Sequence, residues 1–286
     1  MSVSASMNLR EDQEDQVAAI QKQERLLAGL QSLGSVLVAF SGGADSAFLA
    51  WAANRALGNH ALAVTALSPS FPAYDREQAT SFAREWSLRH EFVATREIEN
   101  PLYAANQPDR CYHCKNELFS ELGKLRASRG FAAVAYGVNA DDLRDFRPGH
   151  RAAREHQVAA PLLDAGLTKA EVRELSRSAG LSTWDRPASA CLASRIPYGI
   201  PVNVEELSRI ERAESVLREL GFRQFRVRAH GELGRIEVAA DELPKALQLE
   251  VAQTIAFRLR QVGFTYVTLD LEGYRQGSLN AVLKVI

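Results

Sequence analysis

The chain has few cysteines, little net charge and no long apolar run, and each shortage excludes a class of protein. Only three cysteines occur in 286 residues, an odd number that suits metal or sulfur chemistry better than a disulfide framework. The 34 basic and 35 acidic side chains nearly cancel, which excludes the broad positive field of a nonspecific nucleic-acid binder. No apolar run approaches a membrane span, and residues 1–24 carry no apolar targeting segment. We therefore expect a cytoplasmic protein with no membrane or nucleic-acid partner.

The first half of the chain alternates short apolar segments with helical patterns. An amphipathic helix is expected over residues 11–33, where apolar positions recur at helical spacing. The expected strands are residues 35–40, 61–67, 91–95 and 132–136, and the helices between them are 47–57, 75–88 and 111–129. Strands separated by such helices predict right-handed crossovers and an α/β fold, with a doubly wound parallel sheet covered on both faces.

The second half changes its order of elements. A helix over 168–179 leads into an irregular stretch that carries Pro187, Pro197 and Pro201. Beyond it we expect helices at 204–220 and 243–262, strands at 224–228, 234–238 and 264–271, and a turn at 230–231. This order predicts a smaller C-terminal α+β domain with a mixed sheet. The predicted organisation is an N-terminal helix (1–34), a main domain (35–197) and a domain for substrate binding or oligomerisation (198–286).

A loop of small residues joins the first strand to its helix. Its sequence is Ser41-Gly42-Gly43-Ala44-Asp45-Ser46. A strand, loop and helix in this order place backbone N–H groups and the positive helix end around one point, which suits a phosphate group. The serine hydroxyls can donate to phosphate oxygens, while Asp45 suits a Mg²⁺ ion. The alternative is an ordinary helix N-cap after a glycine turn. A Walker loop is excluded, because its spacing and lysine are absent.

The three cysteines fall into a pair and a single residue. Cys111 and Cys114 form a C-x-x-C at the expected start of a helix, and Cys191 lies far away in the sequence. Cys191 is either a third ligand of a metal cluster or an independent sulfur donor. Three cysteines on a [4Fe-4S] cluster leave one iron open for an extra sulfide. The alternative is that these residues are small buried hydrophobes.

Further polar residues follow strands of both expected domains. Gly137, Asn139, Asp141 and Asp142 come directly after a strand, at the edge where open α/β sheets bind ligands. We expect Gly137 to approach the nucleotide and one aspartate to lie near Mg²⁺, although both aspartates can also cap the next turn. The candidates for a substrate phosphate are Ser194, Arg195, Arg226 and Arg228. Arg226 and Arg228 share one strand face by period two, and the alternative is a face of solvated arginines.

These motifs resemble known proteins. The loop at 41–46 resembles the SGGxDS signature of PP-loop ATP pyrophosphatases, which implies an adenine nucleotide alpha hydrolase-like fold, with ATP bound by Ser41, Gly42, Gly43, Asp45, Ser46 and Gly137. Residues 110–115, 136–142, 145–149, 184–187, 190–199, 226–231 and 235–237 resemble the LarE family of sulfur transferases in nickel-pincer nucleotide biosynthesis. The resemblance covers most of the chain from Ser41 to about Val238.

The resemblance to the LarE family implies a reaction and its cofactors. ATP and Mg²⁺ would activate a carboxylate of pyridinium-3,5-biscarboxylic acid mononucleotide as an adenylate, and sulfur would then be inserted. Family members that carry the C-x-x-C are thought to hold a [4Fe-4S] cluster on three cysteines, here Cys111, Cys114 and Cys191, whereas members without it consume the residue matching Cys191 as a sacrificial donor. A homo-oligomer and a sulfur-delivery protein are further implied partners. The rival functions are a tRNA thiolation enzyme, an ammonia-using amide synthetase and a nucleotide sensor without catalysis.

Overall fold

The computed structural model describes residues 3–144, 148–187, 190–275 and 278, and it divides into two compact units. The first unit comprises Met1–Leu67, Ala73–Thr95 and Cys111–Ser189. The second comprises Ser68–Pro72, Arg96–Arg110 and Ala190–Ile286. Two short segments, which leave the first unit directly after its second and third strands, are thus part of the second unit. The predicted division at residues 34 and 197 stays a prediction of domain organisation.

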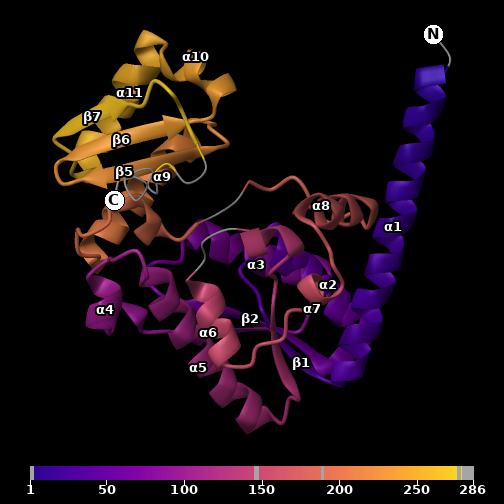
Figure 1. Cartoon of the computed structure of the whole chain (residues 1–286). Helices are drawn as coiled ribbons and strands as arrows, with labels where there is room; N and C mark the ends of the chain where they lie inside the picture. Colours follow the sequence, from indigo (N-terminus) through magenta and orange to yellow (C-terminus); the bar gives the residue numbers. More distant parts are fainter. Residues whose placement is uncertain (1–2, 145–147, 188–189, 276–277, 279–286) are drawn as a thin grey trace. The chain divides into compact units, whose positions relative to one another are not determined.

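The first unit is built on a parallel sheet (Figure 1). Its strands are β1 (Val36–Ala39), β2 (Ala61–Leu67), β3 (His90–Ala94) and β4 (Ala133–Tyr136), in the spatial order β3-β2-β1-β4. The register pairs Ala39 of β1 with Val64 of β2 and with Tyr136 of β4. Because the chain runs outward from β1 to β3 and then returns to the other side of β1, the strand order reverses between β1 and β4. Ligands of open α/β sheets bind at the carboxyl ends of the strands beside such a reversal.

Helices cover both faces of this sheet, as the sequence predicts. The helices of the first unit are α1 (Val3–Leu33), α2 (Ala44–Leu57), α3 (Ala73–Glu85), α5 (Arg110–Arg129), α6 (Gly149–Glu155), α7 (Pro161–Asp164) and α8 (Lys169–Ser178). One buried cluster joins Val36 and Val38 to α1, α2, α3 and α8, and a second joins Leu37 to α5 and α6. Alternate side chains of β1 therefore face opposite cores, which explains why the strand is a continuous apolar run. The α/β prediction with a parallel sheet is confirmed.

The long helix α1 joins the first unit through its second half. Leu26 and Leu30, one turn apart, are fully buried against the core. The Lys22 ammonium pairs with Glu171 of α8 at 2.6 Å. Glu171 also closes a capping box with Thr168 at the start of α8. These contacts fix the N-terminus of α8, where Lys169 lies.

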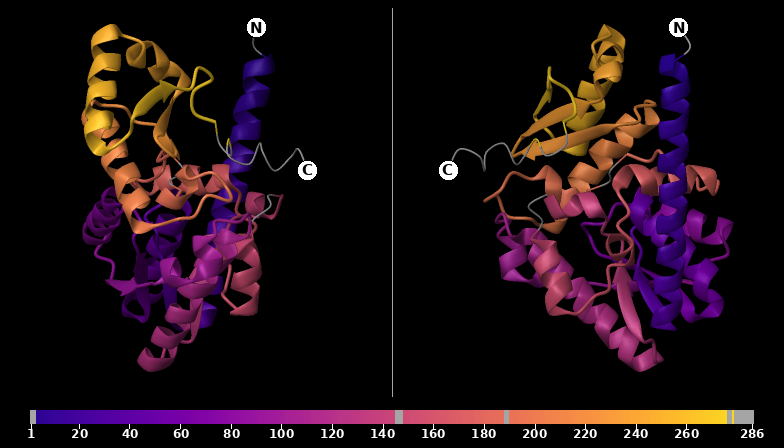
Figure 2. Two further views of the ribbon diagram at one scale, coloured as in Figure 1. Left: turned by 90° about the vertical axis from the view of Figure 1, so that its left-hand side faces the viewer. Right: turned by 45° about the vertical axis from the view of Figure 1, so that its right-hand side comes forward.

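The second unit is a small mixed sheet with helices (Figure 2). Strands β5 (Phe225–His230) and β6 (Leu233–Val238) form an antiparallel hairpin, and β7 (Tyr266–Leu269) pairs with β6 in parallel. Helix α9 (Val204–Glu219) packs on β5 and α11 (Leu249–Val262) on β7, and the two helices contact each other. The short helices α4 (Pro101–Ala104) and α10 (Leu243–Ala246) complete this unit. The predicted mixed sheet is correct.

Some element boundaries differ from the predictions for local reasons. The single helix predicted over 243–262 is wrong, because the chain breaks after Ala246 and restarts at Leu249. Helix α3 ends at Glu85 rather than residue 88, and Ser87 adopts a positive φ of 51°. Helices α6 and α7 were not predicted; they have only 7 and 4 residues, too few to give a period. No helix within the described parts of the chain has the length and apolar character needed to cross a membrane.

Candidate active site

The loop of residues 41–46 turns tightly and opens helix α2. The backbone N–H of Ser41 donates to Ser46 Oγ at 3.2 Å, and Ser46 Oγ donates to the Gly43 carbonyl at 3.0 Å. Gly42 has a φ of +76°, which a glycine adopts without strain. Gly43 is the N-cap of α2, and no side chain caps the helix there. The first N–H groups of α2 therefore have no side-chain acceptor at the cap, as an anion-binding helix start requires.

Asp45 is the centre of a polar cluster beside this loop. Asn139 Nδ2 donates to Asp45 Oδ1 at 3.2 Å, and the Lys169 ammonium pairs with Asp45 Oδ2. Lys169 is fixed in turn, because its backbone N–H donates to Asp141 Oδ2 at 2.8 Å. The carboxyl ends of β1 and β4 thus bring together Asp45 and Asn139, which the sequence places 94 residues apart. Asp142 Oδ2 accepts the backbone N–H of Asn139, three residues before it, at 3.1 Å.

Gly137 lies against the start of α2. A Cβ atom on this residue would meet the backbone N of Ser46 at 2.9 Å and the backbone C of Asp45 at 3.0 Å. We expected Gly137 to approach the nucleotide, and that remains a prediction. The close approach that the structure describes is to the backbone of the loop. Gly137 therefore sets the distance between β4 and the N-terminus of α2.

Substituting Gly137 with alanine is expected to push β4 and α2 apart. Since the atoms in the way are backbone atoms, overpacking should lower the free energy of unfolding by about 1–3 kcal/mol. Gly123→Ala is the matched control, because nothing lies within 4 Å of that position in helix α5. The control should be neutral or stabilising by up to about 1 kcal/mol. Urea denaturation of both variants measures the difference, and equal midpoints would contradict the steric argument.

Arg186 also reaches the loop, although it was not among the predicted site residues. Its guanidinium donates to the Gly42 carbonyl at 2.9 Å and to Asp75 Oδ1 of α3 at 2.7 Å. The Arg186 side chain is 15% exposed and that of Asp75 is 8% exposed. This arginine therefore links helix α3 to the backbone of the loop.

Cys191, in the second unit, lies on a loop with a clamped backbone. Its thiol is free and half-buried. The Arg195 guanidinium donates to the carbonyls of Ala190 at 2.6 Å and of Cys191 at 3.0 Å, on both sides of the cysteine. The same group forms a two-pronged ion pair with Glu214, with distances of 2.8 and 3.0 Å. Because the Arg195 donors are engaged in this way, the arginine holds the Cys191 backbone in place.

Two chain segments from the first half of the sequence support this loop within the second unit. Asn106 Nδ2 donates to the carbonyls of Pro197 and Ile200, both at 2.8 Å. Arg110, the residue before Cys111, donates to the Ala193 carbonyl at 2.9 Å. The backbone N–H of Leu192 donates to the Ser70 carbonyl at 2.9 Å. Residues 68–72 and 96–110 thus supply further hydrogen-bond partners for the backbone near Cys191.

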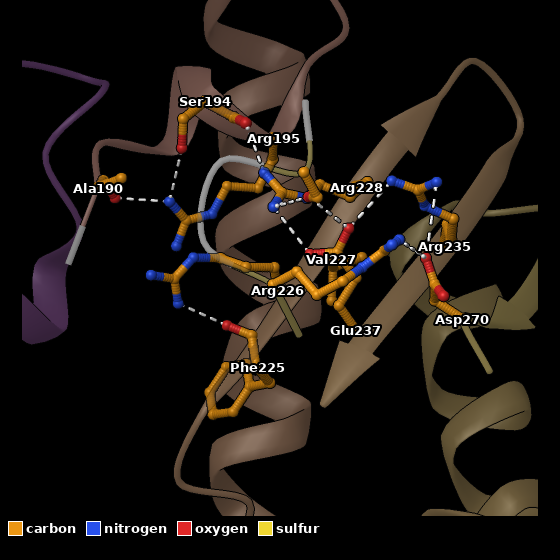
Figure 3. A network of polar contacts seen from close by, with 12 residues as sticks. Ala190, Ser194, Arg195, Phe225, Arg226, Val227, Arg228, Arg235, Glu237 and Asp270 are labelled. Atoms are coloured by element: carbon orange, nitrogen blue, oxygen red, sulfur yellow. Dashed lines mark hydrogen bonds and ion pairs between the residues drawn. The ribbon is translucent and has the colours of Figure 1, made fainter. Parts of the chain in front are cut away.

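The predicted phosphate-binding arginines are buried rather than solvated. Arg226 is 9% and Arg228 is 5% exposed, so the alternative of an exposed strand face is wrong. Arg228 donates to the Ser194 carbonyl at 2.8 Å and to Glu237 Oε2 at 2.8 Å. Figure 3 shows the Arg195 and Arg226 side chains extending in the same direction. Their network contains Ser194, Arg195, Arg226, Arg228, Arg235, Glu237 and Asp270 (Figure 3).

Burial and neighbouring charges shift the pKa values of two groups in this network. Burial, together with the neighbouring Arg195, lowers the pKa of the Arg226 guanidinium below its ordinary value. Burial alone would raise the pKa of Glu214, but Arg195 and Arg226 outweigh it, so the pKa of this carboxyl is lowered. The Nε atoms of Arg228 and Arg235 are buried without a hydrogen-bond acceptor among the described residues. An anion next to these arginines would stabilise their charges and supply acceptors.

The predicted iron ligands are divided between the units. Cys111 and Cys114 lie in the first turn of α5, one helical turn apart, and Cys191 belongs to the second unit. Residues at this spacing lie on the same side of a helix. Within either unit, no three His, Cys, Asp or Glu side chains of the described residues are placed to hold a metal ion. The described residues therefore do not bring the three cysteines together within one unit.

Comparison with known proteins gives the family. No protein-family model matches the chain. A pyridinium-3,5-bisthiocarboxylic acid mononucleotide synthase from Lactiplantibacillus plantarum is 35% identical over 263 residues, which cover 92% of this chain and 95% of that protein. The chain belongs to the LarE family. An uncharacterised Synechocystis protein is 44% identical over 92% of this chain and 98% of its own length. An uncharacterised protein of Methanocaldococcus jannaschii is 28% identical over 84% of this chain and 90% of its own.

Three residues of the site were not predicted from the sequence, and they differ in whether they lie in a segment that resembles the LarE family, here called a LarE block. Arg186 lies in the block at 184–187, and Lys169 and Asn106 lie outside every block. The capping box of α8 was the available signal for Lys169, because it fixes the residue after Thr168 at a helix start. No local pattern marked Asn106, whose bonds reach residues 90 to 94 positions away. Residues 145–147 of another LarE block lie outside the described residues.

Proposed function

We propose that this protein is an ATP-dependent sulfur transferase that converts a carboxylate of pyridinium-3,5-biscarboxylic acid mononucleotide into a thiocarboxylate. The observation that carries the proposal is Cys191, a free thiol whose two flanking carbonyls are held by the buried Arg195–Glu214 pair. A relative of 35% identity is named for the bisthiocarboxylic product. A fixed thiol on a loop is suited to sulfur chemistry, whereas an amide synthetase or a nucleotide sensor has no use for it.

The loop at 41–46 is the proposed site of ATP. The N–H groups at the uncapped start of α2 and the hydroxyl of Ser41 are suited to phosphate oxygens. Asp45 is the proposed ligand of the Mg²⁺ that accompanies ATP, with Asn139 orienting its second oxygen at 3.2 Å. A bound Mg²⁺ would replace the Lys169 ammonium on Asp45 and release that cation for the phosphates. Ser46 orders the loop through its bonds to Ser41 and Gly43.

The proposed reaction has two displacements. A carboxylate oxygen of the substrate attacks the α-phosphorus of ATP, and the bond to the β-phosphate oxygen breaks, so that pyrophosphate leaves. A sulfur nucleophile then attacks the carboxyl carbon of the resulting adenylate, and AMP leaves with the original oxygen. If the nucleophile is the Cys191 thiolate, this step gives a thioester, and loss of the Cα proton with breakage of the Cβ–Sγ bond frees the thiocarboxylate and leaves dehydroalanine at residue 191. A sulfide or hydrosulfide nucleophile gives the thiocarboxylate directly once the bond to its carrier breaks. Activation makes a poor leaving group into a good one, and for this reason ATP is needed.

The three cysteines are the proposed holders of a [4Fe-4S] cluster. Two cysteines one turn apart and a third half-buried cysteine form a donor set of the kind that holds such clusters, with one iron left open. When bound, the cluster would supply that open iron as the place of an exchangeable sulfide. The residues that would hold it are Cys111, Cys114 and Cys191.

The arginine network is the proposed site of the substrate phosphate. Arg226 and Arg228 are the leading candidates. Burial lowers the pKa of the Arg226 guanidinium, and Arg228 Nε is buried without an acceptor among the described residues. Ser194 contributes a hydroxyl next to Arg195, which donates to it at 2.9 Å. The proposed role of Arg195 is to fix the backbone at Cys191, because it donates to the carbonyls of Ala190 and Cys191.

Pyrophosphate release tests this proposal. Wild-type protein with ATP and Mg²⁺ should release pyrophosphate only when the pyridinium mononucleotide is present. Asp45→Asn should lower this rate on the order of a hundredfold or more, because a Mg²⁺ ligand contributes several kcal/mol of charge stabilisation. Asp185→Asn changes an exposed aspartate of the same unit and is the control.

The rival functions predict other results in the same assay. A tRNA thiolation enzyme would release pyrophosphate with tRNA instead of the pyridinium nucleotide. A sensor would bind ATP and release nothing. An amide synthetase would need ammonia and give a product without sulfur, which mass spectrometry distinguishes. Pyrophosphate release that ignores the pyridinium nucleotide would sink the proposal.

A further inference from the structure

Arg186 holds a specific backbone group of the loop. Its NH1 group donates to the carbonyl of Gly42 at 2.9 Å, while its NH2 group is tied to the buried Asp75 at 2.7 Å. The backbone of Arg186 is held as well, because Arg173 donates to its carbonyl at 2.9 Å. The guanidinium lies 5.9 Å from the centre of the Tyr74 ring. Arg173, Asp75 and the Tyr74 ring therefore hold Arg186 in the position from which its NH1 group reaches the loop.

The carbonyl of Gly42 determines where the next N–H points. A trans peptide is planar, so the carbonyl of residue 42 and the N–H of residue 43 point in opposite directions. Since the carbonyl is turned toward Arg186 and Asp75, the Gly43 N–H points to the opposite side. Glycine stands on both sides of this peptide, and glycine offers little steric resistance to a peptide rotation. A contact outside the loop is thus needed to keep one orientation.

We propose that Arg186 is a positioning residue of the phosphate loop. It fixes the Gly42–Gly43 peptide so that the N–H, and not the carbonyl oxygen, faces the phosphate groups of ATP. A flipped peptide would present a carbonyl oxygen to an anion, which repels it, and would remove one donor. This inference rests on the proposed function, because it assigns the ligand of the loop as the triphosphate of ATP.

Nucleotide affinity tests the inference directly. The probe is α,β-methylene-ATP with Mg²⁺, which cannot be split into AMP and pyrophosphate, and its dissociation constant is measured by calorimetry. Arg186→Met should weaken binding roughly ten- to a hundredfold, the factor that corresponds to one charge-assisted hydrogen bond. In turnover, the KM for ATP should rise while the KM for the pyridinium nucleotide stays unchanged. A merely structural role would not separate the two KM values.

Three further variants separate positioning from folding. Arg177→Met is the matched control, because Arg177 pairs with Glu174 and lies over the Trp184 ring without touching the loop. Asp75→Asn keeps the bond from Arg186 to the loop and should change the affinity little. The double variant Asp75→Asn, Arg186→Met removes the charge of the buried Asp75 together with its guanidinium partner, so it keeps the test valid if the single Arg186 variant does not fold.

The outcomes distinguish this inference from the proposed function. Weaker nucleotide binding in both Arg186→Met proteins, with wild-type affinity in Arg177→Met, supports it. Wild-type affinity in the double variant overturns it, and the proposed function then stands on pyrophosphate release by the wild-type protein. A wild-type protein that neither binds the analogue nor releases pyrophosphate overturns both.

Discussion

Replacement of Cys191 with serine is expected to abolish formation of the thiocarboxylate while pyrophosphate release continues. The side chains are similar in size, and the contacts that hold the loop use the carbonyl of residue 191 rather than its thiol. The loop should therefore keep its conformation. A hydroxyl neither supplies sulfur nor binds iron as a thiolate does. Mass spectrometry of the pyridinium product, alongside a pyrophosphate assay, measures the two steps separately.

Cys111→Ser and Cys114→Ser decide how sulfur is supplied. If a cluster is held by three cysteines, each variant should lose iron and sulfide after anaerobic purification and should lose the product as well. If Cys191 is instead a sacrificial donor, both variants should complete one turnover, and mass spectrometry should find dehydroalanine at residue 191. A colourless, metal-free wild-type protein whose Cys191 remains intact after incubation with substrates would contradict both routes.

Truncation of Glu214 should give the largest loss of stability in the second unit. Arg195 and Glu214 have side chains that are only 3% and 6% exposed. Glu214→Ala would leave the Arg195 guanidinium buried without its carboxylate, and Val227 would lose the acceptor of its N–H at 3.1 Å. Breaking a buried pair from one side typically costs about 3–5 kcal/mol. The Cys191 loop should loosen as well, since Arg195 holds it, and sulfur transfer should fall with stability.

The same carboxylate should make stability depend on pH. Its pKa in the folded protein lies below the ordinary 4.5. The unfolded chain therefore binds the proton first as pH falls, and the contribution of Glu214 is fully present above about 4.5. It is lost as the pH drops through the lower folded-state pKa. Denaturation of wild type and Glu214→Gln from pH 7 to pH 3 should show converging stabilities.

Glu219→Ala is the control for both measurements on Glu214. Glu219 lies on the same helix and pairs with Arg258 at 2.5 Å, but its side chain is 60% exposed. Solvated pairs contribute only about 0–1 kcal/mol. A loss at Glu219 as large as that at Glu214 would show that burial is not the cause.

The sequence was sufficient for those parts of the fold that depend on local pattern. β2 was predicted to the residue, because its apolar run is bounded by clear turns. The loop at 41–46 was found for the same reason, since strand, glycines and helix follow one another directly. The approach of Gly137 to the nucleotide stays a prediction, and the close approach in the structure is to the backbone of Asp45 and Ser46, which the sequence did not predict.

What the sequence did not predict depends on contacts between distant residues. Arg186 meets Gly42 across 144 positions, and Lys169 meets Asp45 across 124. An arginine alone in a sequence does not reveal whether its donors serve a ligand or the protein. Arg195 was therefore predicted to bind phosphate, while the structure places its guanidinium on Ala190, Cys191, Ser194 and Glu214. Whether Arg195 also meets a phosphate stays a prediction.

The second unit is assembled from three separate segments of the chain, which limits how its gene can be divided. Residues 68–72 and 96–110 belong to the second unit, and Asn106 and Arg110 supply bonds that residues 190–200 need. A gene fragment that encodes only the chain after residue 190 would lack those donors. No single cut in the coding sequence therefore separates the two units and leaves all segments of the second unit together. An exchange of the second unit between related genes has to carry residues 68–72 and 96–110 together with the chain after residue 190.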